Sequence, residues 1–346
     1  MRDMSIPAQH DLSGVAELLR AATDVTLLAH VRPDADALGS ALALGRALHL
    51  RGATVRVSFA VPGQTPESLR GLDVASLIVP VAEVPASSSL LICVDTPSPS
   101  RLGSLADRIE ATRAAGGSVL VIDHHASNLR YGTHHLVDPH AEATAVLVLE
   151  LLDELGVPLD EPIARCLYAG LVTDTGGFRR ATPATHQAAA RLLQAGVDPE
   201  RLTREIIDDH PFAWLPMLSK VLGTARLEPE SAQGFGLVHA TVSAEASAMV
   251  RMEETEAVVD VVRSTRDAEV AAVLKEQAPG EWTVSLRALG KIDVSAAARS
   301  LGGGGHRLAS GATVYGTVEE ALAQVRNALS AAPLIELSAG RDVQER

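Results

Sequence analysis

A short apolar run in the first half of the chain ends abruptly in three side chains that could do chemistry. Residues 118–125 read S-V-L-V-I-D-H-H, which places Asp123, His124 and His125 directly after the run. Val, Leu and Ile without alternation predict a strand buried on both faces of a parallel sheet. Ligands of such sheets bind beyond the carboxyl ends of the strands. One carboxylate and two imidazoles are therefore expected to face a ligand there, and the alternative is a capped loop with solvated histidines.

A second turn offers His30, Asp34 and Asp36 in the sequence H-V-R-P-D-A-D-A-L-G-S, after the apolar residues 25–29. A loop that folds back could bring all three together, and carboxylates with an imidazole suit Mn²⁺ or a similar divalent cation. The alternative is that Asp34 or Asp36 only caps the helix expected to run to residue 50, because helix starts favour Asp.

Two further acids stand at comparable places. Asp95 follows the apolar residues 90–94, and Asp174 begins a Gly-containing loop after a helix expected over 162–171. Four such turns together predict a pair of divalent cations about 3.5–4 Å apart, with a shared carboxylate and a bridging water. Carboxylate-rich ligation with His favours Mn²⁺ or Mg²⁺ over structural zinc, which prefers cysteine.

Residues 131–143 are expected to be irregular. They hold His134, His135, Asp138 and His140, but no strand is expected before each of them. This group is therefore interpreted as solvated or helix-capping side chains.

The second half offers two features that could hold a phosphate. Backbone N–H groups of Gly303, Gly304 and Gly305 could form an anion nest to which His306 adds a donor. Arg287, in the expected strand 282–288, could bind a phosphate with two hydrogen bonds. The alternatives are a flexible helix C-cap for the Gly run and an ordinary surface residue of an edge strand for Arg287.

The elements that must position these residues indicate an α/β protein. In the first half, strands expected over 25–29, 54–59, 76–79, 90–94 and 119–123 alternate with helices, which predicts a parallel sheet covered by helices. Right-handed crossovers would bring the strand ends to one edge. The expected organisation is a catalytic metal-binding domain over 10–209, a linker helix over 210–231, a smaller α/β substrate-binding domain over 232–335 and a tail over 336–346.

Composition bounds the function further. The chain has 346 residues and a net charge of −13, which disfavours binding of long nucleic acid but not of a short anionic substrate. No apolar stretch reaches the roughly 20 residues of a membrane span, and the N-terminus lacks the apolar core of a secretory signal. Cys93 and Cys166 lie in apolar surroundings. We therefore expect a cytoplasmic protein with buried thiols and no disulfide.

The order of these motifs resembles one family. H-V-R-P-D-A-D-A-L-G-S, V-D-T-P-S, D-H-H and L-V-T-D-T-G, followed by G-G-G-G-H-R-L-A-S-G-A, are similar to the DHH/DHHA1 phosphoesterases over roughly residues 10–335. Within that family the two-domain length and the G-G-G-G-H segment most resemble the nano-RNase type. Ala35 departs from the Gly that many relatives carry between the two acids, with little expected consequence because Ala tolerates most turn geometries.

The resemblance implies a role for each residue. One Mn²⁺ would be held by His30, Asp34 and Asp95, and the other by Asp36, Asp95, His124 and Asp174, with Asp95 bridging. Mg²⁺ or Co²⁺ are the alternative ions. His125 would contact the scissile phosphate or protonate the leaving oxygen, and Asp123 would orient the histidines. Arg287 and the segment Gly303, Gly304, Gly305 and His306 would bind the substrate's far end.

The resemblance also implies the reaction. The enzyme would degrade very short oligoribonucleotides to mononucleotides and dephosphorylate 3′-phosphoadenosine 5′-phosphate to AMP. One alternative is a phosphodiesterase for cyclic di-AMP or linear di-adenylate, and another is a non-catalytic nucleotide-binding regulator, which should have lost a metal ligand. A homodimer is also expected, with the aliphatic helix over 144–155 either in its interface or simply in the core.

Overall fold

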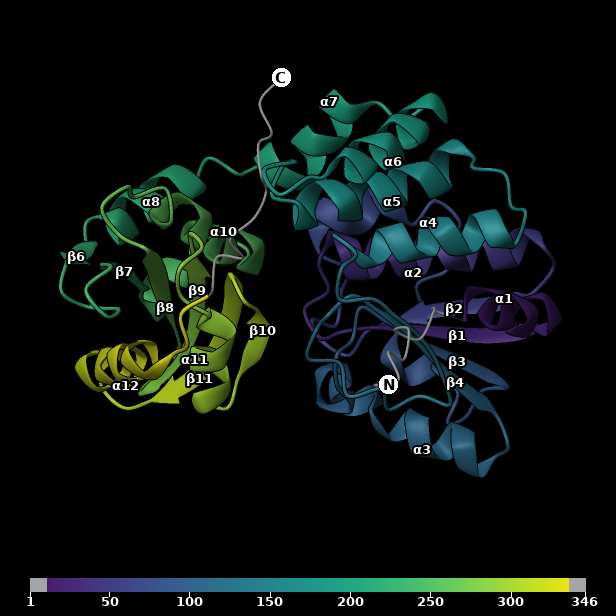
Figure 1. The fold of residues 1–346 in the computed structure, drawn as a ribbon, viewed down its shortest axis with the longest axis horizontal. Helices are drawn as coiled ribbons and strands as arrows, with labels where there is room; N and C mark the ends of the chain where they lie inside the picture. Colours follow the sequence, from purple (N-terminus) through teal and green to yellow (C-terminus); the bar gives the residue numbers. More distant parts are fainter. Residues whose placement is uncertain (1–10, 336–346) are drawn as a thin grey trace, which may run out of the picture. The chain divides into compact units, whose positions relative to one another are not determined.

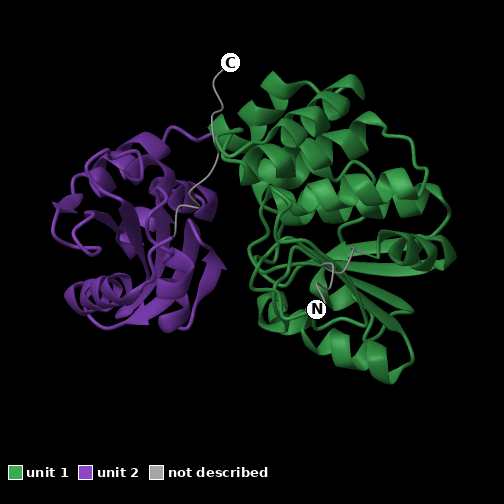
Figure 2. Ribbon diagram, in the orientation of Figure 1, with its two compact units in different colours: residues 1–209 green, residues 210–346 purple. Residues whose placement is uncertain are grey.

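The computed structural model describes residues 11–335, and the expected tail over 336–346 lies outside them. The chain divides between Asp209 and His210 into two compact units (Figure 1, Figure 2). Each unit has a sheet and apolar clusters of its own. Among the described residues, no helix is both long and apolar enough to cross a membrane.

The first unit is built on a five-stranded parallel sheet in the order β2-β1-β3-β4-β5. Its strands are β1 (Asp24–Ala29), β2 (Thr54–Ser58), β3 (Leu90–Val94), β4 (Ser118–Asp123) and β5 (His134–Val137). Its helices are α1 (Leu12–Ala21), α2 (Ala35–Leu50), α3 (Asp107–Ala114), α4 (Thr144–Glu154), α5 (Glu161–Asp174), α6 (Pro183–Gln194) and α7 (Pro199–Thr203). The expectation of a parallel sheet covered by helices is confirmed.

Apolar side chains cover both faces of this sheet. Leu27 of β1 packs in the cluster that contains α2, α4 and α5, whereas its neighbour Leu28 packs in the cluster that contains Ile109 of α3. Figure 1 shows these helices on opposite sides of the sheet. Burial on both faces explains why β3 and β4 are continuous apolar runs, and it leaves the strand ends as the place for polar groups.

Two expectations about the first unit are corrected. Residues 76–79 form no strand but one isolated bridge, in which Ile78 pairs with Val57, and Ser76 has a positive φ of 54° that interrupts an extended chain. Residues 131–143 are not wholly irregular, because β5 pairs with β4 at the sheet edge. A four-residue edge strand with two histidines has too short an apolar pattern to be recognised from sequence.

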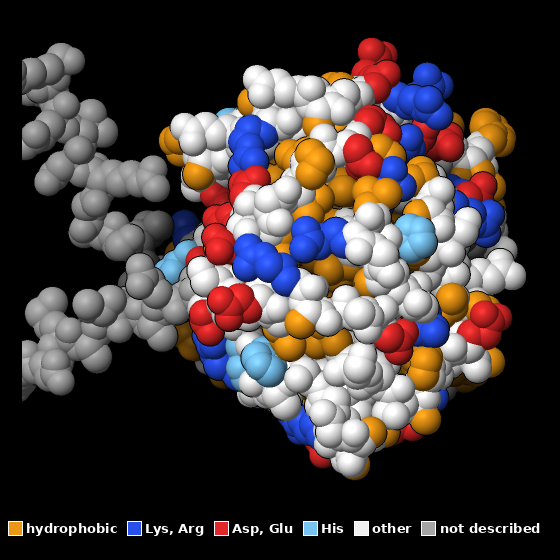
Figure 3. Space-filling model, turned by 90° about the vertical axis from the view of Figure 1, so that its right-hand side faces the viewer, with side chains coloured by type: hydrophobic (Ala, Val, Ile, Leu, Met, Phe, Trp, Pro, Cys, Tyr) orange, Lys and Arg blue, Asp and Glu red, His pale blue; other side chains and the backbone are white. Residues whose placement is uncertain are grey.

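The surface drawn in Figure 3 carries acidic and basic side chains interspersed with hydrophobic ones. The chain has 43 acidic side chains against 30 Lys and Arg. The face in view therefore presents charges of both signs and not a continuous basic track.

The second unit is built on a mixed six-stranded sheet in the order β10-β11-β9-β8-β7-β6. Its strands are β6 (Arg226–Glu228), β7 (Leu237–Val242), β8 (Val270–Ala278), β9 (Glu281–Ala288), β10 (Gly304–His306) and β11 (Ala309–Tyr315). Its helices are α8 (Trp214–Leu222), α9 (Ala244–Ser247), α10 (Met252–Val262), α11 (Val294–Ser300) and α12 (Val318–Ala331). Among the described strands of this sheet, only β7 and β8 pair in parallel.

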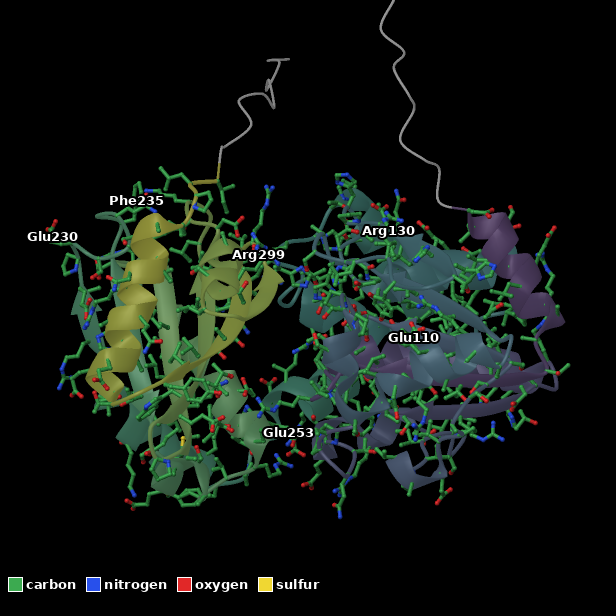
Figure 4. The ribbon with its side chains drawn as sticks, turned by 90° about the horizontal axis from the view of Figure 1, so that it is seen from below. Glu110, Arg130, Glu230, Phe235, Glu253 and Arg299 are labelled. Carbon is green, nitrogen blue, oxygen red and sulfur yellow. The ribbon has the colours of Figure 1, made fainter. Side chains whose placement is uncertain are left out.

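Helices pack on both faces of this second sheet as well. Val258 of α10 and Met217 of α8 share a cluster with Val273 of β8, and the α11 and α12 side chains pack on the other face. The linker helix expected over 210–231 is shorter than predicted, because α8 ends at Leu222 and residues 226–228 form β6; α8 packs within the second unit. At the start of β7, the Nζ of Lys291 lies 4.7 Å from the ring centroid of Phe235, which is labelled in Figure 4.

Candidate metal centre

Three neighbouring strands of the first sheet end in acidic or histidine side chains. His30 follows β1, Asp95 follows β3, and Asp123 ends β4 before His124 and His125. Because β1 pairs with β3 and β3 with β4 in parallel, their carboxyl ends lie along one edge of the sheet. Residues far apart in sequence therefore meet there.

One group of donors consists of His30, Asp34 and Asp95. His30 Nε2 lies 3.7 Å from Asp34 Oδ2 and 3.5 Å from Asp95 Oδ2. Asp34 is also the N-cap of α2, where its Oδ1 accepts hydrogen bonds from Asp36 N and Ala37 N. Asp34 therefore caps α2 through Oδ1, while its Oδ2 faces His30.

A second group consists of Asp36, His124 and Asp174. His124 Nε2 lies 3.1 Å from Asp174 Oδ2 and 3.9 Å from Asp36 Oδ2. Asp36 is fully buried in the first turn of α2, and Asp174 is the last residue of α5. This group therefore joins the strand edge to the two helices that cover it.

Asp95 lies between the two groups. Its Oδ2 faces His30, and its Oδ1 lies 3.7 Å from His124 Nε2 and 3.5 Å from His125 Nδ1. The residue has a positive φ of 53°, a left-handed conformation that Asp adopts more readily than most residues. The carboxylate thereby turns in from the strand end, with one oxygen toward each group.

The site's electrostatics reflect crowded carboxylates. Burial, together with the charges of Asp174 and Asp95, raises the pKa of Asp36 well above its usual range. Burial opposes ionisation of Asp95 too, but the hydrogen bond from His30 and the charges of His125 and His124 hold its pKa well below normal. The pKa values of the two carboxyl groups are therefore shifted in opposite directions, which marks the cluster as a candidate functional site.

The histidines respond to the same acids. Burial alone would lower the pKa of His30, but contacts with Asp34 and Asp95 raise it to about 10. Burial is likewise outweighed at His124, whose contacts with Asp174, Asp95 and Asp36 raise its pKa to about 11. A positive charge is thus strongly favoured among these carboxylates.

The donors present fit divalent cations. Imidazole nitrogens and carboxylate oxygens are the ligand types of Mn²⁺ and related ions, and they converge here in two groups of three. Neither group contains a cysteine, which argues against a structural zinc site. A cation would offset the repulsion that raises the pKa of Asp36.

His125 is held by Asp123. Its Nδ1 lies 2.7 Å from Asp123 Oδ1, and the other Asp123 oxygen accepts a hydrogen bond from Asn128 Nδ2. Asp123 is fully buried, so these bonds fix its orientation. Asn128 was not singled out from the sequence, although it lies only five residues from Asp123.

The sequence-predicted groups in the second unit lie on one sheet face. Arg287 pairs with Ala309 of β11, which in turn pairs with His306 of β10, and cross-strand partners share a face. Arg287 Nε lies 4.0 Å from Asp260 Oδ1 of α10. The edge-strand alternative is wrong, since β9 lies between β8 and β11.

The Gly run differs in part from its expected geometry. Gly303 N donates to Ala298 O at the end of α11, at 2.8 Å, so this N–H acts in the helix C-cap. Gly304 and Gly305 lie in β10 and pair with Gly311 and Ser310. A strand was not expected because glycine is a poor strand former, and here the pairing with β11 imposes it.

The histidines of residues 134–140 lie apart from the two groups. His134 and His135 lie in β5, and Asp138 Oδ1 accepts a hydrogen bond from His140 N at 2.8 Å. This contact of Asp138 lies in a local turn and is not a helix cap, since the N-cap of the following helix α4 is Ala143.

Two residues near the cluster were missed from the sequence. Thr144 donates from Oγ1 to Asp95 Oδ1 at 2.8 Å, and Arg101 Nη2 lies 3.2 Å from His30 Nδ1. The sequence predicts Thr144 only as the first residue of an aliphatic helix. No local pattern marks either residue, because their contacts form across distant parts of the chain.

Comparison with known proteins agrees with this geometry. The N-terminal domain of the DHH family matches residues 24–171, and the DHHA1 domain matches residues 236–332. The chain belongs to the DHH family of phosphoesterases. This DHH protein is accordingly a hydrolase, and both the resemblance seen in its motifs and the expected enzyme class are confirmed.

Two curated relatives span most of this DHH chain. It is 35% identical to the bifunctional oligoribonuclease and PAP phosphatase NrnA of Thermus thermophilus, over 92% of this chain and 94% of that protein. It is 27% identical to the cyclic-di-AMP phosphodiesterase GdpP of Bacillus subtilis, over 90% of this chain but 48% of that protein.

A solved structure shares the fold. The crystal structure of an exopolyphosphatase-related protein from Bacteroides fragilis superposes with a TM-score of 0.80, covering 92% of this chain and 95% of that one. Its sequence identity is 24%, so this likeness supports the architecture alone.

Proposed function

We propose that this protein is a manganese-dependent phosphoesterase that degrades very short oligoribonucleotides to mononucleotides and dephosphorylates 3′-phosphoadenosine 5′-phosphate to AMP. The observation that carries the proposal is Asp95, whose two oxygens face the two groups of donors. The 35% identity to an oligoribonuclease and PAP phosphatase over nearly the whole chain favours these substrates.

Two divalent cations would complete the site. His30, Asp34 and Asp95 would hold one, and Asp36, Asp95, His124 and Asp174 would hold the other. Mn²⁺ is the ion we propose, with Mg²⁺ or Co²⁺ as alternatives. When bound, such cations lower the pKa of water and offset the charge that develops on the phosphate during in-line attack.

His125 would supply the proton for the leaving oxygen. Burial lowers its pKa, but the hydrogen bond to Asp123 and the charge of Asp95 outweigh burial and raise the pKa above the ordinary value. Because Asp123 accepts from Nδ1, the proton on Nε2 of the charged ring would be the one transferred.

In the second unit, Arg287, Gly304, Gly305 and His306 would bind the substrate, whereas Gly303, whose N–H is bonded to Ala298 O in the C-cap of α11, would only shape this segment. The row that joins Arg287 to His306 through Ala309 sets the two donors about 10 Å apart at the backbone, two strand spacings of the sheet. A nucleotide phosphate bound by the Arg287 guanidinium would fit this face.

A short substrate suits the overall charge. The net charge of −13 disfavours an extended nucleic acid, which needs a basic footprint. The one face drawn in Figure 3 carries charges of both signs. A substrate with only a few phosphates would need no basic footprint, because the two proposed cations would supply positive charge where the phosphates bind.

A cyclic di-AMP or linear di-adenylate phosphodiesterase is the second candidate. It is favoured by the alignment of this chain with about half of GdpP, at 27% identity. A non-catalytic nucleotide-binding regulator is the third, but the retention of a donor at every position of the two groups favours an enzyme.

A product profile separates these functions. The protein with Mn²⁺ is incubated with 3′-phosphoadenosine 5′-phosphate, linear di-adenylate, cyclic di-AMP or an RNA of about two dozen nucleotides, with a chelator control. Mononucleotides from the first two substrates and little product from the long RNA are expected. Preference for the cyclic substrate would move the role to second-messenger turnover, and binding without turnover would favour the regulator.

The role of Arg287 has its own test. Arg287→Ala should raise KM with little change in kcat, because a lost charge-assisted contact weakens binding by about 1.5–3 kcal/mol. Arg263→Ala is the matched control, since Arg263 also pairs with Asp260. A pure kcat loss in Arg287→Ala would contradict a binding role.

We also propose a homodimer. The helix considered for its interface, α4, is largely buried within its own chain, with Leu147, Leu151 and Leu152 in the first core cluster. A dimer would therefore use another surface. Light scattering tests the dimer, and a monomer mass would remove it.

A further inference from the structure

The loop before α4 and the first turn of that helix touch three of the proposed cation ligands. Ala141 O lies 3.1 Å from His124 Nδ1, which leaves His124 Nε2 facing the carboxylates. Thr144 contacts both Asp36 and Asp95. This segment therefore contacts the proposed ligands through its backbone and the Thr144 hydroxyl. Its histidines make none of these contacts.

The Thr144 hydroxyl acts on the shared carboxylate. It donates to Asp95 Oδ1 at 2.8 Å, and the residue is fully buried. The bond restricts rotation of the carboxylate about its last torsion. Because Oδ1 is the oxygen nearer His124 and Oδ2 the oxygen nearer His30, the same bond keeps each oxygen directed to its own group.

The first N–H groups of α4 act on Asp36. Thr144 N donates to Asp36 Oδ2 at 2.7 Å, and Ala145 N donates to Asp36 Oδ1 at 2.9 Å. The N-cap residue of α4, Ala143, has no capping side chain, so Asp36 takes that role from 108 residues away. The N-terminal end of a helix dipole stabilises a carboxylate placed there.

The loop itself is tied to a third element. Glu142 Oε1 accepts hydrogen bonds from the hydroxyls of Thr182 and Thr185, at the N-terminus of α6. The same segment thus joins α6, α4 and the carboxylate cluster. The segment that carries Thr144 is therefore anchored at α6 as well as at the carboxylate cluster.

We propose that Thr144 is a positioning residue of the hydrolytic site, which acts through Asp95. Its hydroxyl sets the orientation in which Asp95 serves both halves of the cluster, while its backbone N–H holds Asp36. The inference rests on the proposed function, since it assigns Thr144 a task in that same site.

The test compares Thr144→Val with Thr144→Ser. Val keeps the branched shape and the backbone N–H but loses the hydroxyl, and Ser keeps the hydroxyl. Thr112→Val is the matched control, because Thr112 is equally buried and accepts a hydrogen bond from Ser88 N, but lies on α3. Circular dichroism and urea unfolding establish that each variant folds.

Two measurements are made on each variant. Calorimetric titration of the apo-protein with Mn²⁺ gives the number and affinity of the sites, and steady-state kinetics on 3′-phosphoadenosine 5′-phosphate give kcat and KM. Thr144→Val should weaken Mn²⁺ binding, kcat or both by about 10–100-fold, the usual effect of losing a partner that orients a ligand. KM should change little, and Thr144→Ser should restore most of the loss.

Equal Mn²⁺ binding and equal kcat in Thr144→Val and the wild type would overturn the inference. So would a loss of similar size in Thr112→Val, or a failure of Thr144→Ser to restore function. If the wild type binds Mn²⁺ but hydrolyses none of the substrates, the proposed function fails. The Mn²⁺ titrations still test the positioning role in that case.

Discussion

In the first unit, buried carboxylates lie beside one another, whereas in the second unit buried charges lie beside opposite charges. Asp36, Asp95 and Asp174 crowd around His124, and the pKa of Asp174 is raised by burial despite its hydrogen bond to that histidine. By contrast, the fully buried Glu254 accepts hydrogen bonds from the Arg251 guanidinium.

A second example from the second unit shows the same pattern. Lys275 of β8 is 3% exposed, and its Nζ contacts Glu256 of α10 and donates to Ser285 Oγ at 2.9 Å. The charge of Lys275 is thus balanced by Glu256 of the same unit. The comparison teaches that crowded buried carboxylates would be stabilised by a bound cation, as we propose, whereas a pair of opposite charges needs no added ion.

The largest effect is expected from Asp95→Asn. The change keeps the shape and the left-handed backbone but removes the charge that faces both groups, so hydrolysis should fall by about a thousandfold, the equivalent of several kcal/mol of charge stabilisation. Initial rates with Mn²⁺ and circular dichroism measure this. Asp198→Asn, which changes only the cap of α7, is the control. Retained turnover in Asp95→Asn would break the two-cation scheme.

Gly170→Ala should disturb the cluster from the helix behind it. A Cβ at Gly170 of α5 would lie 2.5 Å from Asp36 Oδ1 and 2.9 Å from Asp36 Cα. We expect a loss of about 1–3 kcal/mol in unfolding free energy from overpacking, together with a lower hydrolysis rate. Urea unfolding and kinetics measure the two effects.

Gly45→Ala is the control for that prediction. Its Cβ would lie 3.2–3.4 Å from side-chain atoms of Leu77, Val55 and Val57, which can shift. Equal effects of the two substitutions on the hydrolysis rate would show that the space beside Asp36 has no special importance.

In the second unit, Glu256→Ala should destabilise more than Lys275→Met. Removal of the acid leaves a buried ammonium without its opposite charge, whereas Met replaces the lysine with an apolar chain of similar length. Losses of about 2 kcal/mol and of less than about 1 kcal/mol are expected. Trp214 and Trp282 are the two tryptophans and both belong to this unit, so their fluorescence follows its unfolding. The reverse order would contradict a balanced pair.

The smallest effect is a pH dependence of the second unit. The Arg326 guanidinium hydrogen-bonds Glu228 and lowers its pKa from 4.5 to about 2. Because the folded-state pKa lies below the unfolded value, the stabilisation is complete above pH 4.5 and is lost as the pH falls toward 2. Tryptophan-detected urea midpoints between pH 5 and 3 should fall less steeply in Arg326→Gln. An unchanged slope would contradict the pairing.

Much of the candidate metal centre could be predicted from the sequence because it lies where short-range patterns are strong. The apolar runs of β1, β3 and β4 identify buried strands, and the strand ends are where a parallel sheet gathers polar groups. This rule alone predicts that the residues at the ends of these strands converge, namely His30, Asp95 and Asp123.

The parts of the fold and of the site that could not be predicted depend on contacts between residues far apart in the sequence. Thr144 reads as the first residue of an aliphatic helix, and its partner Asp36 lies 108 residues earlier. The strand β10 consists of two glycines and His306, and its pairing with β11 supplies the extended conformation that its composition does not favour.

The left-handed backbone at Asp95 has a consequence for how this protein can change over generations. Asn and Gly also accept a φ of 53°, whereas most other replacements at this position are strained. An aspartate codon becomes an asparagine codon through a single base change. Under the proposed function, one such mutation would remove hydrolysis and leave the proposed nucleotide-binding residues in place, which gives a short evolutionary route from enzyme to receptor.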